Sequence, residues 1–405
     1  MNANWQSATT GTPNLAELIR GARDSSPVSG LTHNFYRYPA RFSPAFVRAA
    51  IKAFSQPGDW ILDPFVGGGT SLVEAIAHGR NAIGIDISAL ATFICEAKTQ
   101  LVNDDEVAAL RRWAARLDEV INIHGPSRES SLYSMAGYFR NLEGQPYWRL
   151  KKAIEQLLAS VSRLDYGAAQ TIARCIVLKT AQWALDSRKS LPTVGRFRKE
   201  ILVQAEAMIG AAVEFQARTK SSRVGRTPTV VCLNRSAAGM EADPALRRRP
   251  RPKLIITSPP YPGIHVLYHR WQVDGRKETP APFWIANRLD GAGLSYYTMG
   301  DRKNPELRTY FENLEATFRS IALVCDDETT VVQMVAFSEP EWQLAKYLEV
   351  MSKCGLQEVC PWKRADLGDG ADGRLWRDVP NRRWHADQKE HAPGSREVVL
   401  IHKKA

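Results

Sequence analysis

One segment, residues 59–86, constrains the fold of this chain more than any other. It begins with a short apolar run, Asp59-Trp60-Ile61-Leu62-Asp63, which has the length and composition of a buried strand. A glycine-rich loop follows, then helical spacing from Ser71 to His78, then a second apolar run from Asn81 to Ile85 that ends at Asp86. A strand, a tight loop, a helix and a second strand in this order open a doubly wound α/β sheet.

The other elements of this sheet are predicted on both sides of that segment. Apolar residues recur at helical spacing from Pro44 to Ala53, and Pro57-Gly58 ends this helix before the first strand. Later strands are expected at residues 229–234, 253–257 and 329–335, helices at 310–324 and 339–354, and an antiparallel pair that closes the sheet at 358–362 and 397–402.

Residues 104–228 interrupt the sheet pattern. Helical spacing dominates residues 104–122 and 146–217, and strand signals are few, so we interpret this region as a mostly helical insertion. It separates two halves of one sheet domain, residues 31–103 and 229–405. Residues 1–30 are rich in Ser, Thr, Gly and Pro around one amphipathic piece, Leu15 to Arg23, and we expect them to form a flexible N-terminal arm.

The charge of the chain favours a polyanionic partner. Lys and Arg total 54 against 43 Asp and Glu, which gives a formal net charge of +11. Such an excess of positive charge attracts phosphate groups. Many basic proteins bind no nucleic acid, so the charge supports a polyanionic partner without identifying one.

Cysteine usage and hydropathy exclude several classes of protein. The six cysteines are scattered and include no C-x-x-C pair, so the sequence predicts neither a zinc site nor a disulfide framework, and we expect no metal. His265 and His269 lie four residues apart without a neighbouring metal-binding carboxylate pattern. The sequence shows neither a signal-peptide pattern nor an apolar run that would span a bilayer, so we expect a cytoplasmic protein without membrane attachment.

The glycine-rich loop is the first candidate binding site. It reads Asp63-Pro64-Phe65-Val66-Gly67-Gly68-Gly69-Thr70, and the missing β-carbons let the backbone approach a ligand closely. A tight turn also needs glycines, so the triplet alone does not decide. Asp86 ends the next strand, where a carboxylate can accept both hydroxyls of a ribose. Together they indicate a nucleoside cofactor, although the loop is not the G-x-G-x-x-G of dinucleotide sites.

D-P-F-V-G-G-G-T resembles the cofactor-binding motif of the amino-group DNA methyltransferases, usually written D-P-F-x-G-x-G-T. The resemblance implies S-adenosylmethionine as the cofactor, with Asp63 and the glycine loop near its methionine part and Asp86 at its ribose. Upstream, residues 38–44 look like the P-A-K-F segment of the family, with Arg41 in place of the lysine. Arginine can still pair with a carboxylate. Asn234 stands where the family often presents a polar residue to adenine. The expected cofactor-binding residues are Arg41, Phe42, Asp63, Pro64, Phe65, Gly67, Gly68, Gly69, Thr70, Asp86 and Asn234.

The second candidate site is Ser258-Pro259-Pro260-Tyr261, which directly follows the strand predicted at 253–257. Two prolines fix the backbone and remove two N–H donors, so the carbonyls can accept from an amine. Ser258 and the Pro259 carbonyl can draw an exocyclic amine towards a tetrahedral, nucleophilic geometry, and Tyr261 can stack on a flipped-out base. A plain Pro-Pro turn is the alternative. We expect Ser258, Pro259, Pro260 and Tyr261 to be the catalytic residues.

The same family carries D-P-P-Y, N-P-P-Y or S-P-P-Y at this place. Serine is commonest among enzymes that methylate N4 of cytosine, whereas D-P-P-Y dominates those acting on N6 of adenine. The resemblance therefore implies site-specific methylation of cytosine N4, with adenine N6 as the near rival. An RNA guanine-N2 methyltransferase and a cofactor-binding DNA-recognition protein without activity are further alternatives. The expected partner is double-stranded DNA. A restriction endonuclease or another component of a phage-defence system is the expected protein partner.

The order of the two motifs indicates where the DNA is recognised. Because the family places target recognition between them, the helical insertion is the expected reader, and it offers a basic cluster at residues 188–199 for phosphate contacts. A solvated basic face explains that cluster equally well. The run Arg247–Lys253 either contacts the DNA backbone near the flipped base or is a solvated linker. Residues 262–271 are candidates for the base pocket, and residues 374–384, with Trp376 and Trp384, are a second candidate for DNA contact.

Overall fold

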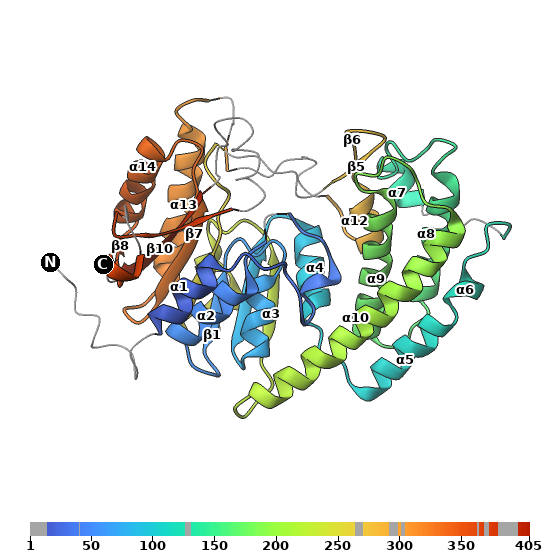
Figure 1. Ribbon diagram of the computed structural model, residues 1–405, viewed down its shortest axis with the longest axis horizontal. Coiled ribbons are helices and arrows are strands. Elements are labelled where there is room, and N and C mark those ends of the chain that lie inside the picture. Colours follow the sequence, from blue (N-terminus) through green and yellow to red (C-terminus); the bar gives the residue numbers. More distant parts are fainter. Residues whose placement is uncertain are drawn as a thin grey trace.

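The computed structural model describes residues 14–39, 41–125, 131–263, 270–290, 299–300, 304–362, 364–367, 372–379 and 396–405. An eight-stranded mixed sheet forms its centre (Figure 1). Along the sheet the strands are β3 (Val230–Asn234), β2 (Asn81–Asp86), β1 (Trp60–Asp63), β4 (Leu254–Thr257), β7 (Thr330–Ala336), β10 (Arg396–Lys404) and β8 (Leu356–Glu358), and β9 (Leu375–Asp378) also pairs with β10. The first five are parallel to one another, and β10 is antiparallel to β7, β8 and β9.

Apolar residues alternate along the strands and so build one core on each face of the sheet. Ile61 contributes to the core beneath α1 (Leu15–Arg23), α2 (Pro44–Phe54) and α3 (Thr70–Ala77), whereas the adjacent Leu62 faces α13 (Arg308–Val324) and α14 (Pro340–Lys353). Two helical layers on a mostly parallel sheet make the doubly wound α/β fold, with its antiparallel closing strand, that the sequence predicts.

The strand predictions are confirmed, with one shift. The structure places β1, β2, β3, β4, β7 and β10 within one or two residues of the predicted bounds. The prediction of a strand at 358–362 is wrong in its position, because β8 ends at Glu358. Cys360 is consequently exposed rather than part of the core.

The N-terminal region differs from the expected flexible arm. Leu15–Arg23 forms helix α1, which buries Leu18 and Ala22 against α2. Gly21 permits the close approach, since a β-carbon there would lie 2.8 Å from the carbonyl oxygen of Ala45. Residues 14–23 are therefore an integral layer of the fold, and residues 1–13 lie outside the described part.

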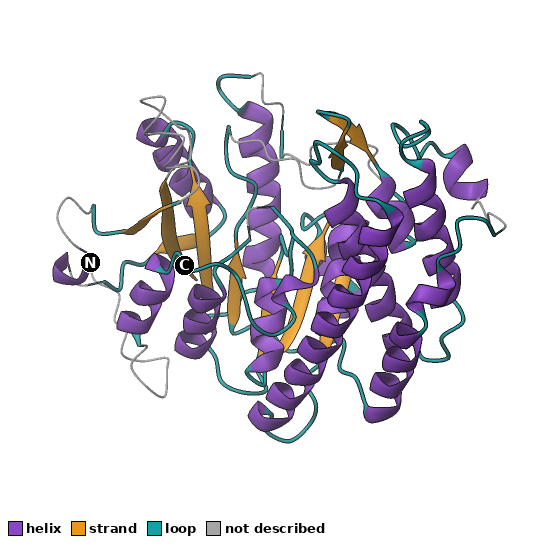
Figure 2. Cartoon of the chain, turned by 45° about the vertical axis from the view of Figure 1, so that its right-hand side comes forward, coloured by secondary structure: helices purple, strands orange, loops and turns teal. Residues whose placement is uncertain are grey.

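A second unit, mostly helical, packs beside the sheet (Figures 1 and 2). Its core is shared with α4 (Ala89–Thr99), the helix that follows β2. As predicted, residues 104–228 contribute only helices to the described structure before β3: α5 (Asp104–Ala115), α6 (Leu117–Val120), α7 (Ser131–Met135), α8 (Trp148–Val161), α9 (Gly167–Leu185) and α10 (Val194–Ser222).

The helical unit also includes residues from the second half of the sheet domain, residues 229–405. The hairpin β5 (Trp271–Val273) and β6 (Lys277–Thr279) and the short helix α12 (Ala281–Ala286) contribute Trp271 and Phe283 to its core. Their apolar side chains are buried in that core. The predicted boundary between the helical insertion and the sheet domain, at residue 229, therefore does not separate the two units. The remaining short elements are η2 (His33–Phe35), η3 (Met240–Ala242), α11 (Pro244–Arg247) and α15 (Arg364–Leu367).

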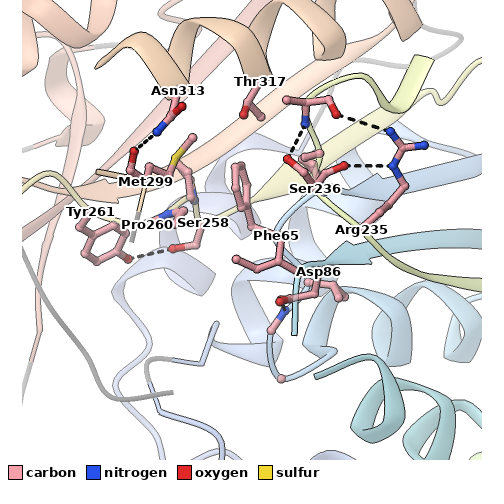
Figure 3. Close-up of a pocket in the computed structure, with 18 of the residues that line it drawn as sticks. Phe65, Asp86, Arg235, Ser236, Ser258, Pro260, Tyr261, Met299, Asn313 and Thr317 are labelled. Atoms are coloured by element: carbon pink, nitrogen blue, oxygen red, sulfur yellow. Dashed lines mark hydrogen bonds between the residues drawn. The ribbon is translucent and has the colours of Figure 1, made fainter. Parts of the chain in front are cut away.

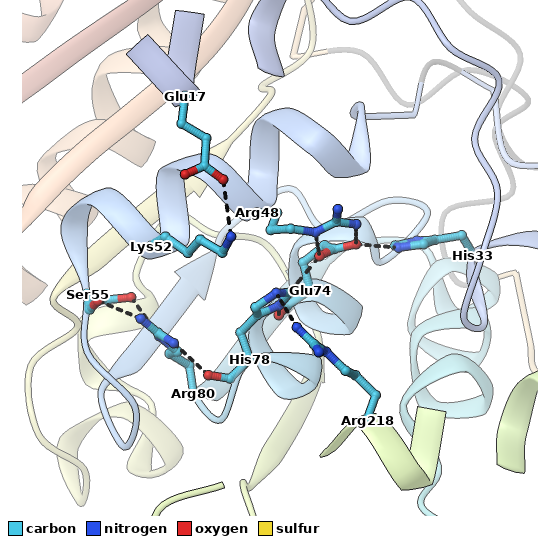
Figure 4. A network of polar contacts seen from close by, with 9 residues as sticks. All are labelled: Glu17, His33, Arg48, Lys52, Ser55, Glu74, His78, Arg80 and Arg218. Carbon is cyan, nitrogen blue, oxygen red and sulfur yellow. Dashed lines mark hydrogen bonds and ion pairs between the residues drawn. The ribbon is translucent and has the colours of Figure 1, made fainter. Parts of the chain in front are cut away.

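A buried carboxylate holds the N-terminal helices together (Figure 4). Glu74 on α3 is fully buried; one oxygen lies 2.9 Å from Nε2 of His33, and the other accepts from Nε of Arg48 at 3.0 Å. Burial alone would raise the pKa of the Glu74 carboxyl, but the hydrogen bonds from His33 and Arg48 hold it below its ordinary value. The ionised carboxylate therefore stabilises the junction of η2, α2 and α3.

We expect Glu74→Gln to lower the free energy of unfolding at pH 7 by about 2 kcal/mol, because hydrogen bonds to a charged group are lost. The folded-state pKa is lowered, so this stabilisation is present above the ordinary glutamate pKa of 4.5 and is lost as the pH falls through the folded value. Urea unfolding of both proteins at pH 7 and at pH 4 measures the difference, which should shrink at pH 4. Glu17→Gln, which removes a surface pair with Lys52, is the control and should change stability little. A difference that is the same at both pH values would contradict the assignment.

Candidate active site

A cavity lies at the carboxyl ends of β1 and β4, where the strand order changes direction. From β1 the chain continues to β2 on one side, and from β4 it continues to β7 on the other. Doubly wound sheets bind their ligands at this switch point. The cavity has a volume of about 330 Å³, and Figure 3 shows side chains from the β1, β3 and β4 loops and from α13 around it.

Both predicted motifs meet in this cavity. The loop after β1 and the loop after β4 are far apart in sequence, but their strands are hydrogen-bonded neighbours. The predicted residues that line it are Arg41, Phe42, Pro64, Phe65, Gly67, Gly68, Thr70, Asp86, Ser258, Pro259, Pro260 and Tyr261.

The glycine loop is held from behind by two charged groups. Asp86 accepts from the backbone N–H of Gly67 at 2.9 Å, and the fully buried Lys98 donates to the Gly68 carbonyl at 2.6 Å. A β-carbon on Gly68 would lie 3.1 Å from Cβ of Tyr38 and 3.3 Å from Cγ of Arg41. Because Gly68 has no side chain, the loop can form a wall of the cavity and also lie close to Tyr38 and Arg41.

Asp86 has two functions in this geometry. It lines the cavity, and its other oxygen accepts from the N–H of Ser88 at 2.8 Å. Burial raises the pKa of the Asp86 carboxyl to about 6, against the effect of these backbone hydrogen bonds.

Lys98 was not predicted, and its place on α4, one turn after Cys95, gave no sequence signal of a loop contact. Burial lowers the pKa of the Lys98 ammonium to about 7.

Asp63, one of the expected cofactor-binding residues, lies beneath the cavity surface. Asp63 is 1% exposed and is absent from the cavity lining. Its carboxylate accepts from Oγ of Ser71, from Oγ1 of Thr257 at 2.8 Å and from the N–H of Phe65 at 3.1 Å. Burial raises the pKa of this carboxyl to about 6. Asp63 therefore joins β1, α3 and β4, and it shapes the site without lining it.

Gly69 and Asn234 also lie outside the cavity lining. Gly69 has a φ of +74° and precedes α3, with Cys95 packed against it. Asn234 is exposed and donates to the Asp86 carbonyl at 3.1 Å, because its side chain turns back along the strand edge. The residues after it, 235–238, line the cavity instead, which their place beyond the carboxyl end of β3 would have indicated.

The loop after β4 is fixed by hydrogen bonds on two sides. Oγ of Ser258 lies 3.0 Å from the Tyr261 hydroxyl, which donates to Glu397 at 2.7 Å. Tyr310 on α13 donates to the Pro260 carbonyl at 2.8 Å, whereas no residue of the described ranges donates to the Pro259 carbonyl. Sequence reasoning missed Glu397 and Tyr310, which come from distant elements, and it missed the α13 residues Asn313 and Thr317 and the loop residue Met299 in the lining.

The basic run Arg247–Lys253 lies away from the Ser258–Tyr261 loop. Lys253 precedes the first residue of β4, whereas Ser258 follows its last, so the run lies at the opposite edge of the sheet. Arg249 packs over the Trp60 ring and Arg251 donates to the Leu323 carbonyl. The expected base-pocket residues 264–269 and the candidate DNA contacts 380–384 lie outside the described residues.

Within the described ranges, no group of three or more His, Cys, Asp or Glu side chains is arranged to hold a metal ion. No helix in this part of the chain combines the length and apolar character needed to cross a bilayer.

Residues 16–92 match the model of the N6_N4_Mtase family, described as DNA methylase. This segment includes α1, the 38–42 segment, the glycine loop and Asp86. The match is confined to residues 16–92.

Over short stretches the chain is also similar to type II methyltransferases and to a DNA adenine methyltransferase. The type II methyltransferase M.MjaII of Methanocaldococcus jannaschii is 43% identical over 68 residues, which are 17% of this chain and 13% of that protein. M.MvaI of Kocuria varians is 37% identical over 81 residues, 19% of this chain and 18% of that protein. The DNA adenine methyltransferase YhdJ of Escherichia coli K12 is 40% identical over 65 residues, 16% of this chain and 22% of that protein. The chain thus matches less than a quarter of the length of each.

Among solved structures, the chain is similar to the rRNA methyltransferase aviRa from Streptomyces viridochromogenes. The identity is 11% and the TM-score is 0.37, over 95% of this chain and 96% of that one.

We expect Gly69→Ala to lower the free energy of unfolding by about 3 kcal/mol. Its left-handed backbone disfavours a side chain, and the new β-carbon would lie 2.9 Å from Sγ of Cys95. Gly30→Ala is the matched control, since Gly30 has a similar φ of +80° with open space around it, and it should cost about 1 kcal/mol. Adding Cys95→Ala should recover part of the loss in Gly69→Ala when both are measured by denaturant unfolding. Equal losses at positions 69 and 30 would contradict this packing.

Proposed function

We propose that the chain is an S-adenosylmethionine-dependent DNA methyltransferase that acts on an exocyclic amino group of a flipped-out base. The observation that carries this proposal is that one cavity is lined by both the glycine loop of the DNA methylase segment and the Ser258–Tyr261 loop. One wall lies in the segment that matches a DNA methylase model, and the opposite wall presents acceptors suited to an amine.

The residues of the first wall fit S-adenosylmethionine. Gly68 leaves a cradle that a β-carbon would fill, Arg41 brings a cation for a carboxylate, and Asp86 brings an acceptor for ribose hydroxyls. Phe65 and Ala237 add apolar surface for a flat ring. The cofactor, when bound, supplies a methyl group on a positively charged sulfur. The chain binds and orients this group, and the cavity wall limits its contact with water.

The second wall would position the amine. Oγ of Ser258 and the Pro259 carbonyl accept its two N–H groups, and this draws the nitrogen lone pair away from the ring. Tyr261 offers an aromatic face to the base. Tyr310 stiffens the loop through the Pro260 carbonyl, so the two acceptors keep their spacing.

Cytosine N4 is the proposed target atom. The support is Ser258 at the first position of the motif, because S-P-P-Y is commonest among cytosine-N4 enzymes in the family that the sequence resembles. Adenine N6 is the second candidate, and the similarity of 65 residues of the chain to a DNA adenine methyltransferase favours it. The names of the matched relatives favour DNA over RNA as the substrate, and a type II relative supports a restriction-modification setting.

The helical unit is the proposed DNA-reading part. Its α9 end lies close to the cavity: the backbone N–H of Arg37, one residue before the cavity residue Tyr38, donates to Gln182, and the Arg37 guanidinium pairs with Asp186 at 2.9 Å. The exposed Lys189 follows directly, and Arg196 and Lys199 lie on the first turns of α10. Arg188 and Arg198 donate to the carbonyls of Trp183 and Ile121, so they anchor this surface.

We expect Asp86→Ala to raise the dissociation constant of S-adenosylmethionine at least tenfold, because the variant loses an acceptor in the cavity and the bond that holds Gly67. Isothermal titration calorimetry measures it. Asp59→Ala, at the amino end of β1, is the control and should bind the cofactor as the unmodified protein does. Unchanged affinity in Asp86→Ala would remove the assigned role.

Ser258→Ala and Tyr261→Ala should each lower the rate of methyl transfer to DNA by about 10²-fold while cofactor binding survives, since both side chains face the base rather than the cofactor. Transfer of labelled methyl groups measures the rate, and Cys360→Ala serves as an exposed control. Mass spectrometry of nucleosides from DNA of expressing cells then identifies N4-methylcytosine or N6-methyladenine. Unmodified turnover in either variant would refute the catalytic assignment.

A further inference from the structure

A chain of hydrogen bonds leads from the cavity to a buried ion pair at the antiparallel end of the sheet. Oγ of Ser258 and the Tyr261 hydroxyl are 3.0 Å apart, and the Tyr261 hydroxyl donates to Oε1 of Glu397 at 2.7 Å. Oε2 of Glu397 lies 2.6 Å from both Nε and a terminal nitrogen of Arg377. These contacts join the catalytic loop to β9 and β10, far away in sequence.

We propose that Glu397, held by Arg377, is a positioning residue that makes the Ser258 hydroxyl an acceptor towards the base amine. This inference rests on the proposed function of the cavity, and it adds two residues that no motif of the family segment contains. Neither residue lines the cavity, so both act through Tyr261.

The antiparallel course of β10 explains how Glu397 reaches the site. Parallel strands end at the cavity edge, but an antiparallel strand begins there. Ala336, the last residue of β7, pairs with Glu397, the second residue of β10, and Glu397 pairs across the next ladder with Arg377. A charge at the start of β10 therefore lies beside the loop that follows β4.

The ion pair fixes which groups donate along this chain. The guanidinium of Arg377 can only donate, and it occupies Oε2, so an ionised Glu397 presents Oε1 as an acceptor. The Tyr261 hydroxyl donates its single proton in a hydrogen bond to this oxygen. The Tyr261 oxygen must then accept at its other side, and the proton of Ser258 supplies that bond. The direction of each hydrogen bond follows from the carboxylate.

The consequence appears at Oγ of Ser258. A hydroxyl has one proton and two lone pairs, and the proton is now committed to Tyr261. Within the described part of the chain, Tyr261 is the sole bonding partner of this oxygen, so its lone pairs can face an amine. A carboxylate at this position would be an acceptor in any orientation, whereas a serine becomes a dependable acceptor only when its proton is held elsewhere.

Burial makes this arrangement rigid. The side chains of Arg377 and Glu397 are 13% and 9% exposed, and Arg377 also donates to the Ala22 carbonyl at the end of α1. Removing one partner of a buried ion pair leaves an uncompensated charge, so the pair is strongly coupled. The substitution must therefore keep the volume and the bond to Arg377.

Glu397→Gln meets that requirement and reverses the direction of the hydrogen bonds between residues 397, 261 and 258. Arg377 has no acceptor, so it selects the amide oxygen and leaves the amide N–H group pointing at Tyr261. The Tyr261 oxygen then accepts, its proton turns to Ser258, and the Ser258 proton turns towards the amine, where it opposes binding of an N–H group. We expect kcat for DNA methylation to fall about 100-fold, with the KM for DNA and the S-adenosylmethionine dissociation constant unchanged within twofold.

The test measures methyl transfer and cofactor binding for the unmodified protein, Glu397→Gln, Tyr261→Phe and the double variant. Tyr261→Phe keeps the aromatic ring but cuts the chain, and it should lower kcat about tenfold. In that background Glu397→Gln should change kcat no further, because the pathway to Ser258 is already gone. Glu358→Gln, which alters the comparable Arg374–Glu358 pair on β8 away from the cavity, is the matched control and should keep full activity.

The outcomes separate this inference from the proposed function. An unmodified protein that methylates no DNA refutes the proposed function, whatever the variants do. An active protein whose Glu397→Gln variant keeps its kcat refutes the positioning role, and so does an additive loss in the double variant, because a merely structural defect adds to any other. If Glu397→Gln does not fold, Tyr261→Phe decides alone: full activity overturns the proposal and a selective loss of kcat supports it.

Discussion

The buried carboxylate of Asp63 is the interaction on which the candidate site depends. It ends β1 and accepts hydrogen bonds from Ser71 at the start of α3 and from Thr257 at the end of β4. The two loops that leave β1 and β4 are therefore tied to one point, directly beneath the cavity. Burial raises its pKa to about 6, so the hydroxyl donors oppose a real desolvation cost. The residue that the resemblance places near a cofactor acts in this structure as the joint between the two walls.

Around that joint, buried charged side chains of several elements bond to other groups of the protein. Asp86 and Lys98 hold the N–H and the carbonyl of adjacent glycines, and Glu74 holds η2 and α2 on the back of α3. Burying such charged groups costs free energy, and they stabilise the fold only when their hydrogen bonds are all made. Their effect is a glycine loop whose position is set before any ligand arrives, which is the condition for tight and oriented binding.

The other wall depends on the reversal of a single strand. Five parallel strands bring only loops to the cavity edge, but antiparallel β10 brings the beginning of a strand there, with Glu397 fixed by its neighbour Arg377. A rigid strand residue thus reaches a loop residue, Tyr261, and through it Ser258. The helical unit is joined to the segment before Tyr38 through the bonds of Arg37 to Gln182 and Asp186.

The sequence by itself determined the sheet, the two motifs and their meeting at one edge, because strand periodicity, glycine loops and proline pairs are local properties of the chain. Leu15–Arg23 and residues 271–286 were misjudged, since short apolar pieces are stable only against a partner that sequence does not display. Only the tertiary structure decided that Asp63 turns inward, that Asn234 turns away and that Glu397, Tyr310 and Lys98 support the loops. Those roles arise from contacts between residues distant in sequence, and a side chain's hydrogen-bond partners are set by the packing of the elements that carry them.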